Sequence, residues 1–409
     1  MLTRRGLAVL ISPIALAIAG RVFGIVELYM LAAGAIALIA ASFVAVWLRT
    51  ITVDVTRSIH PPRVPAGTPS RVDLEIRNRG RRRSPVVAIN DPFDGGRRWA
   101  RFHAAPLPPA ARERAAYRVP TERRGIFDVG PLEVVLSDPF GLTARKVPAA
   151  GITQLTVYPR IDRVVALPPT LGNDPHAGAD HPTALSGMGE DFYALREYEI
   201  GDDTRRVHWP STARVDDLMI RQDEMPWQSR TTILLDVRRH IHTPEAFELA
   251  VSAAASIHDA CRRQGSLTRL LTTAGVDSGF SSGHAHDAAI LEHLAAVNPS
   301  RDDRFAAVVT SLRTSPHGGA IAVVTTGDAP ASDLDAMAAL RSRYGSVVIV
   351  VIERSAYSGE HAHTATSPVA RQAARIIRVD STADFASAWQ AAFGRRQQRY
   401  RARTGGRAL

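Results

Sequence analysis

Two long apolar runs near the N-terminus constrain this chain more than any other feature of its sequence. Residues 7–20 carry no charge, residues 25–48 carry one, and four residues separate the two runs. A helix needs about 20 residues to cross a hydrocarbon core of ~30 Å. The second run meets this length, and the first meets it when counted through Phe23. We therefore expect a two-helix transmembrane hairpin over residues 1–49.

Basic residues flank this pair and are sparse in its turn. Arg4 and Arg5 precede the pair, Arg49, Arg57 and Arg63 follow it, and the turn holds Arg21. Because loops rich in arginine and lysine stay on the cytoplasmic side, both ends of the hairpin and the bulk of the chain are expected there. The sequence thus predicts a multi-pass protein with the lipid bilayer as a partner.

A cleaved secretory signal is the alternative. Arg4 and Arg5 would be its basic start, and residues 17–19 (Ala-Ile-Ala) a small-residue cleavage site. A chain processed there would cross the membrane once through the second run. The remainder would still lie in the cytoplasm, so the two interpretations place the bulk of the protein in the same compartment.

The composition of the chain narrows the classes of partner that we expect for it. The net charge of +10 comes from arginine, since Lys146 is the single lysine. These arginines are spread along the chain, and the few aromatic residues do not alternate with them as a base-stacking surface would require. We therefore expect no nucleic-acid partner. The lone Cys261 excludes an internal disulfide.

Residues 50–160 alternate apolar and polar side chains between closely spaced turn signals. This pattern is typical of half-buried strands and predicts an all-β immunoglobulin-like sandwich. Strands are expected at residues 51–55, 72–76, 86–89, 115–119, 132–136 and 155–158. The motifs at 123–125 (Arg-Arg-Gly) and 138–142 (Asp-Pro-Phe-Gly-Leu) are interpreted as turns. Residues 161–186, rich in Pro, Gly, Ala and His, are expected to be a linker.

Residues 225–395 alternate strand and helix patterns. Strands are expected at 232–237, 267–271, 321–325, 347–352 and 375–379, and helices at 245–263, 287–296, 305–312, 333–344 and 385–393. This alternation predicts a parallel sheet with helices on both faces. Ligands of such sheets bind beyond the carboxyl ends of the strands, which here carry Asp236, residues 325–328 and Glu353. Residues 396–409 form a basic tail.

Residues 187–224 concentrate charged, aromatic and special residues. Phe192, Leu195 and Tyr198 recur at helical spacing and predict a short helix, and residues 218–220 predict a strand. We interpret this segment as a binding or structural hub fixed by ion pairs. Its residues are Glu190, Arg196, Tyr198, Asp202, Arg205, His208, Trp209 and Arg214. The alternative is a hydrolase that uses Asp202, His208 and Ser211, although no strand-turn-helix elbow surrounds the serine.

These residues carry a family resemblance. The runs 189–192 (Gly-Glu-Asp-Phe), 195–198 (Leu-Arg-Glu-Tyr), 201–203 (Gly-Asp-Asp), 205–209 (Arg-Arg-Val-His-Trp) and 211–214 (Ser-Thr-Ala-Arg) resemble the signature of the domain-of-unknown-function 58 family. The resemblance implies a protein anchored in the bacterial inner membrane, with a von Willebrand factor A-like, Rossmann-type C-terminal domain. It also implies a MoxR-type AAA ATPase as partner, in envelope processes or complex assembly, and no established enzymatic activity.

The resemblance also allows a test for metal. Metal-binding A domains hold a divalent ion with Asp-x-Ser-x-Ser after the first strand, plus a Thr and an Asp from later loops. Here residues 236–240 read Asp-Val-Arg-Arg-His, so basic groups replace both serines. We expect Arg238 to neutralise Asp236 or Asp328, and the degenerate set Asp236, Thr325 and Asp328 to hold no metal or other cofactor. A metal-dependent adhesion domain is the alternative, and the sequence leaves self-association open.

Overall fold

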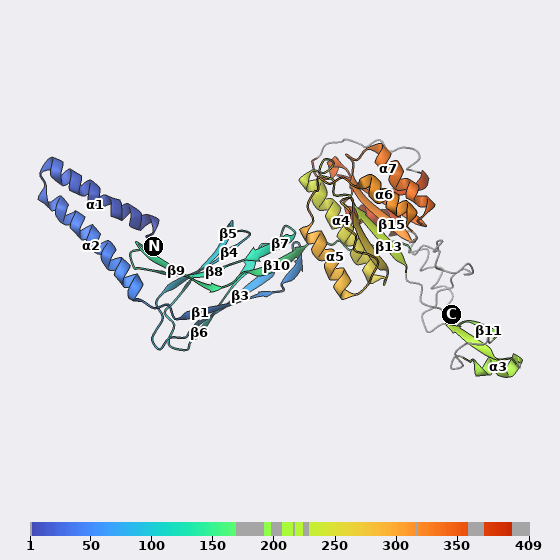
Figure 1. The fold of residues 1–409 in the computed structure, drawn as a ribbon, viewed down its shortest axis with the longest axis horizontal. Helices are drawn as coiled ribbons and strands as arrows, with labels where there is room; N and C mark the ends of the chain where they lie inside the picture. The colour runs from blue at the N-terminus through green and yellow to red at the C-terminus, as the bar shows by residue number, and fades with distance from the viewer. Residues whose placement is uncertain are drawn as a thin grey trace. The chain divides into compact units, whose positions relative to one another are not determined.

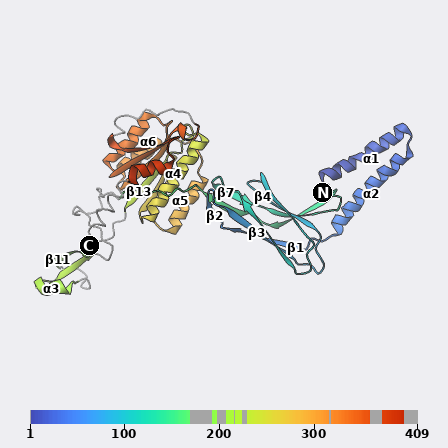
Figure 2. The same ribbon diagram turned by 180° about the vertical axis from the view of Figure 1, so that it is seen from behind.

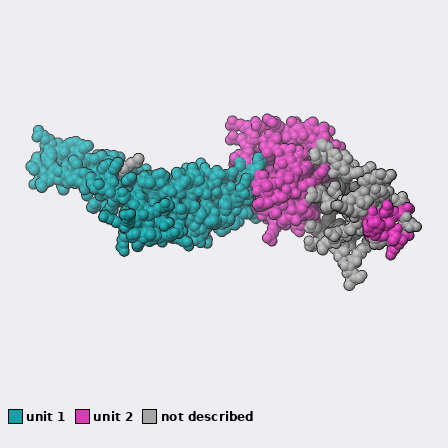
Figure 3. Space-filling model, turned by 60° about the horizontal axis from the view of Figure 1, so that its bottom comes forward, with its two compact units in different colours: residues 1–160, 292–296 teal, residues 161–291, 297–409 magenta. Residues whose placement is uncertain are grey.

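A computed structural model describes most of the chain. The described residues are 2–168, 192–197, 207–215, 217–223, 229–315, 318–358 and 372–394. They divide into two compact units, one comprising residues 1–160 with 292–296 and the other residues 161–291 with 297–409 (Figure 3).

Two apolar helices open the first unit. Helix α1 (Arg4–Phe23) and helix α2 (Val26–Leu48) lie side by side and antiparallel (Figures 1 and 2). Gly24 joins them in the left-handed conformation, with φ of 66°, which glycine adopts at little cost. Both helices are long and apolar enough to cross a membrane. Most of their large apolar side chains face outward rather than into a protein core.

The turn at residues 138–142 holds this hairpin to the strands that follow. Asp138 accepts hydrogen bonds from the backbone N–H of Thr143 (2.5 Å) and from the Thr143 hydroxyl (3.1 Å). Burial alone would raise the pKa of Asp138, but these hydrogen bonds outweigh it and lower the pKa. The backbone N–H of Thr3, at the start of α1, donates to the Leu142 carbonyl (2.9 Å), and the Thr143 hydroxyl bonds the Ser42 carbonyl of α2 (3.0 Å).

The rest of the first unit is a β-sandwich, as predicted. One sheet has the antiparallel order β1-β3-β6, and the other has the order β2-β10-β7-β4-β8-β9, with β5 paired to β4. Apolar side chains from both sheets form one core cluster. The strands are β1 (Val53–His60), β2 (Arg63–Pro65), β3 (Ser70–Asn78), β4 (Val87–Phe93), β5 (Arg98–Ala104), β6 (Arg112–Val119), β7 (Gly125–Val129), β8 (Leu132–Ser137), β9 (Ala144–Ala150) and β10 (Thr153–Tyr158).

Arg57 lies inside this sandwich. Its guanidinium pairs with Asp91, and both side chains are almost fully buried. The Tyr117 hydroxyl donates to the same carboxylate (2.7 Å). Burial raises the pKa of Asp91, although Tyr117 and Arg57 oppose this effect. Arg57 therefore adds no free positive charge beside the hairpin, and the flanking charge depends on the other arginines.

The second unit is an α/β domain with a fully parallel sheet, as predicted. Its strand order is β14-β13-β15-β16-β17. Helix α4 contacts β13 and β15, whereas α6 and α7 share an apolar cluster with the strands (Figure 2). The elements are β13 (Arg230–Leu235), α4 (Pro244–Arg263), β14 (Leu267–Thr272), α5 (His284–Ala296), α6 (Phe305–Thr314), β15 (Ala320–Thr326), α7 (Ala331–Ala338), η2 (Ala339–Ser342), β16 (Ser346–Ile352), η3 (Arg354–Ala356) and β17 (Arg375–Val379).

The start of the expected linker belongs to this α/β domain. In the segment 161–168, Val164 and Leu167 are buried. The backbone N–H of Asp162 donates to the Ser256 hydroxyl on α4 (2.9 Å), and the indole N–H of the buried Trp389 donates to the carbonyl of Val165 (2.8 Å). Two apolar side chains and two hydrogen bonds thus fix a segment that has no periodic pattern of its own.

Candidate functional site

The strand order places a switch point between β13 and β15. From β13 the chain goes outward to β14 on one side and then returns to β15 on the other. In doubly wound sheets, ligands bind beyond the carboxyl ends of the strands at such a point. Asp236 follows β13 directly, and Thr325 is the next-to-last residue of β15. This edge of the sheet is therefore the candidate site.

Asp236 is fully buried, and its carboxylate has little capacity left for an external ligand. Arg238 donates to it from Nε (3.0 Å, to Oδ1) and Nη2 (2.8 Å, to Oδ2). The Thr273 hydroxyl donates to Oδ1 (3.1 Å) and the Thr325 hydroxyl to Oδ2 (3.0 Å). A carboxylate offers about four acceptor positions. These side chains of the protein itself therefore fill the positions that a cation would need.

Arg238 lies between two carboxylates at this edge of the sheet. Its side chain is 4% exposed, and its Nη1 donates to Asp333 (2.7 Å), so one guanidinium bridges two carboxylates. The guanidinium also lies over the ring of Phe305, 4.3 Å from the centroid. Burial disfavours the charged form, but hydrogen bonds from the guanidinium to Asp236 and Asp333, and their charges, outweigh this and raise the pKa of Arg238. One buried positive charge is thus shared by two carboxylates of the protein itself.

The predicted residues are only partly brought together. Asp236 and Thr325 are in contact, and the expectation that Arg238 neutralises Asp236 is confirmed. The alternative partner Asp328 was wrong, because its carboxylate pairs with Arg354 (3.0 Å). Asp333, Thr273 and Phe305 were missed. The described residues contain no group of three His, Cys, Asp or Glu side chains that could hold a metal ion.

The signature segment folds differently from the expectation. The predicted helix at residues 192–198 is a strand, β11 (Phe192–Glu197), paired antiparallel with β12 (Met219–Asp223). Seven residues are too few for a stable isolated helix, whereas β12 supplies backbone partners along one edge of the strand, with a register shift between Phe192 and Ala194. The predicted strand at 218–220 is confirmed as β12, shifted by one residue at its start. A short helix, α3 (Trp209–Val215), lies between them in sequence.

Backbone and side-chain bonds tie α3 to β12. The N–H of His208 donates to the carbonyl of Met219 (2.8 Å), and the N–H of Met219 donates to the Thr212 hydroxyl (3.0 Å). His208 Nδ1 and Ser211 Oγ are 2.9 Å apart. Because these two residues are three positions apart at the start of one helix, the contact fits local capping of that helix.

The remaining hub residues are resolved unequally. Trp209 is 67% exposed, Arg214 is exposed, and Arg196 lies in β11 opposite Ile220. The other hub residues, Glu190, Tyr198, Asp202 and Arg205, lie outside the described residues. Asp202 is also the third member of the alternative hydrolase triad. The basic tail lies outside the described residues as well. The ion-pair network stays a prediction.

The fold and the site define a doubly wound α/β domain in which ion pairs lie beyond the carboxyl ends of the strands. The same chain contains a β-sandwich and two apolar helices. Residues 194–356 match the model of the family described as "Protein of unknown function DUF58". The family resemblance drawn from the signature residues is confirmed over this range. The match does not extend to the apolar helices or the sandwich.

Several solved structures are similar to parts of the chain. The CARDB domain of the PF1109 protein from Pyrococcus furiosus, solved in complex with di-metal ions, is 12% identical and covers 26% of this chain and 96% of its own, with a TM-score of 0.21. The putative ApaA protein from Bordetella pertussis is 15% identical and covers 26% of this chain and 97% of its own, with a TM-score of 0.18. A β-glucosidase from Listeria innocua is 11% identical and covers 24% of this chain and 16% of its own, with a TM-score of 0.17. No functionally curated protein matches the chain.

Proposed function

We propose that this chain is a membrane-anchored interaction protein that works in the bacterial cytoplasm. The two helices anchor it in the inner membrane, an immunoglobulin-like sandwich follows, and a von Willebrand factor A-like domain binds a partner protein. The observation that carries the proposal is the guanidinium of Arg238 between Asp236 and Asp333. It fills the position where the fold would otherwise bind a ligand or metal.

A closed site changes how the domain can recognise a partner. In a metal-dependent A domain, the bound cation would take part in recognition. Here Asp236 is saturated by internal donors, so recognition falls to exposed side chains around the same edge. Arg239 and His240 are exposed directly after the closed site, and the Asp328–Arg354 ion pair is partly exposed. The surface is thus built for charge-based recognition that requires no metal.

The partner we propose is a MoxR-type AAA ATPase, and the process is envelope maintenance or the assembly of other complexes. The family resemblance supports this choice of partner. An ATPase that remodels other proteins would gain a fixed position at the membrane by binding this chain. No catalysis by the chain itself is part of the proposal.

The proposal can be tested by direct binding. The full-length protein in phosphatidylcholine nanodiscs would be immobilised, and the purified MoxR-type ATPase of the same organism added in buffer containing EDTA. We expect saturable binding that Arg239→Glu weakens at least tenfold. The matched control is Arg341→Glu, an exposed arginine in η2, which precedes β16 and so lies at the amino edge of the sheet. Equal loss in both variants, or binding that needs added Mg²⁺, would contradict the proposal.

A second candidate function is hydrolysis. The observation that favours it is the 2.9 Å distance between His208 Nδ1 and Ser211 Oγ, since a histidine can take the proton of a serine nucleophile. Turnover of an ester or amide panel by the full-length protein, abolished by Ser211→Ala, would establish this function. Wild-type protein that turns over no member of the panel would end it.

A further inference from the structure

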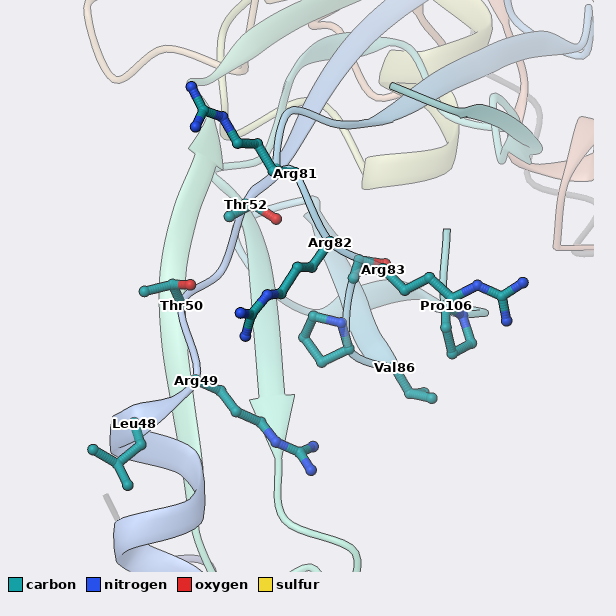
Figure 4. A pocket seen from close by; sticks show the side chains of 12 residues that line it. Leu48, Arg49, Thr50, Thr52, Arg81, Arg82, Arg83, Val86 and Pro106 are labelled. Carbon is teal, nitrogen blue, oxygen red and sulfur yellow. The ribbon is translucent and has the colours of Figure 1, made fainter. Parts of the chain in front are cut away.

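A cavity lies where the second apolar helix meets the sandwich. It is open to the surface and has a volume of about 730 Å³, between the end of α2 and the loop that follows β3 (Figure 4). Its lining comes from residues 48–50, from Thr52, from residues 80–86 and from Pro106. All of these residues belong to the first unit, so the cavity is a property of that unit alone.

Four arginines surround the cavity: Arg49, Arg81, Arg82 and Arg83. All four are exposed, and none forms an ion pair with a carboxylate of the described residues. Arg82 points down toward Arg49, while Arg81 and Arg83 point outward on either side (Figure 4). The neighbouring Arg79 is different, because it pairs with Asp54. The loop thus contains one arginine with an internal partner and three that are left for an external anion.

The loop that carries these arginines is held in place from beneath. Asn78 is fully buried, and its Nδ2 donates to the carbonyls of Arg82 (2.8 Å) and Leu107 (2.9 Å). Its Oδ1 accepts hydrogen bonds from the N–H of Gly80 (2.9 Å) and the hydroxyl of Thr52 (2.9 Å). The backbone that carries the three arginines is therefore fixed before any ligand arrives, which lowers the entropy cost of binding.

The position of the cavity along the chain points to a membrane ligand. Trp47 and Leu48, in the last turn of α2, are 65% and 79% exposed, and tryptophan is enriched at the headgroup level of membranes. Arg49 and the cavity follow at once. We propose that this cavity binds the phosphate headgroup of an anionic phospholipid. The inference rests on the proposed function in one respect, namely that α1 and α2 cross a membrane.

The chemistry of the lining suits a phosphodiester. A guanidinium donates two parallel hydrogen bonds to phosphate oxygens, and the hydroxyl-bearing residues Thr50 and Thr52 line the same cavity. Lining residues Leu48 and Val86 offer apolar contact to the acyl region. Each arginine beside an anionic headgroup strengthens binding about fivefold, so the loss of three should weaken it ~100-fold. The effect should decrease at high salt.

The test compares two triple variants of the full-length protein in a nonionic detergent. Arg81→Gln/Arg82→Gln/Arg83→Gln removes the charges of the loop. Arg71→Gln/Arg118→Gln/Arg123→Gln removes three exposed arginines. Arg71 and Arg118 lie opposite each other in the neighbouring strands β3 and β6, at the end of β3 that is far from Asn78. Binding of dioctanoyl phosphatidylglycerol, dioctanoyl phosphatidylcholine and glycerol 3-phosphate would be followed by microscale thermophoresis.

We expect the loop variant to bind phosphatidylglycerol ~100-fold more weakly than the wild type, and the control variant to stay within about threefold. Phosphatidylcholine and glycerol 3-phosphate should bind weakly to all three proteins. Unchanged binding by the loop variant would overturn the inference. Glycerol 3-phosphate that binds as tightly as the lipid would also overturn it, since the site would then serve a soluble phosphate. Partner binding in phosphatidylcholine nanodiscs reports on the proposed function separately.

Discussion

Replacing Arg238 by methionine should destabilise the α/β domain strongly. The substitution keeps an unbranched side chain but removes the guanidinium that bridges two carboxylates. Asp236 is fully buried and would keep the two threonine hydroxyls as its side-chain partners. Removing one member of a buried ion pair costs about 3–5 kcal/mol. For a domain of this size that corresponds to a decrease in Tm of roughly 6–20 °C.

The assay is thermal unfolding of the full-length protein in detergent, followed by intrinsic fluorescence. Trp389, which is fully buried in the α/β domain, reports on that domain. The control is Arg239→Met, an exposed arginine next in sequence, which should change Tm by less than about 2 °C. Asp236→Asn combined with Arg238→Met should recover much of the loss, because the buried charge is removed. A small effect of Arg238→Met, or no recovery in the double variant, would refute the reasoning.

Three further predictions concern other parts of the chain. His258 is fully buried, and burial, followed by nearby positive charges, lowers its pKa to about 4. Because the unfolded chain binds this proton more readily, the free energy of unfolding should fall by up to ~3 kcal/mol from pH 6.5 to pH 4. Thermal melts at stepped pH should show that His258→Leu removes this part of the loss. Arg238→Ser/His240→Ser recreates the Asp-x-Ser-x-Ser pattern, so Mg²⁺ should raise the Tm of this variant by several degrees and leave the wild type unchanged; an equal rise in both would contradict the account. Asp138→Asn should cost about 1–3 kcal/mol and speed amide exchange at residues 2–10 and 138–144, with the strands of the α/β domain as an unaffected internal control.

The α/β domain was predictable because its strands are buried on both faces. Strands of parallel sheets appear in sequence as continuous apolar runs, and residues 347–352 are an example in which every side chain is apolar and buried. Helix α4 was equally clear, since its apolar residues recur at helical spacing. Its N-cap Thr243 and Pro244 at the first helical position mark its start.

The sandwich was predictable in type but incomplete in detail. Strands β2, β5, β7 and β9 were missed, and three of them carry little apolar alternation. Strand β5, for example, places Arg98, Trp99 and Arg101 at exposed positions. Such strands are stabilised by pairing with a neighbour rather than by a pattern of their own.

The wrong helix at residues 192–198 has the same cause. A spacing of three residues in so short a stretch fits a helix and a strand almost equally. The partner strand β12 begins 22 residues after β11 ends, so the deciding hydrogen bonds are not visible in the local sequence. Tertiary pairing overrode the local pattern.

The composition of the closed site could be predicted in part. The proximity of Asp236 and Arg238 follows from two positions of separation after a strand. Asp333 is 95 positions away, and nothing in the sequence distinguishes it from Asp328, which pairs with Arg354 instead. Long-range pairing between charged residues depends on which loops meet at the sheet edge, and that is a property of the fold.

The central claim is that this chain binds a partner at the membrane without a metal. The most direct measurement is affinity capture of the full-length protein from membranes of its own organism, in buffer containing EDTA, with identification of what co-purifies. The account predicts a MoxR-type AAA ATPase among the captured proteins, and its depletion when Arg239→Glu is the bait. Capture of envelope enzymes alone, or of the ATPase at equal levels by both baits, would contradict it.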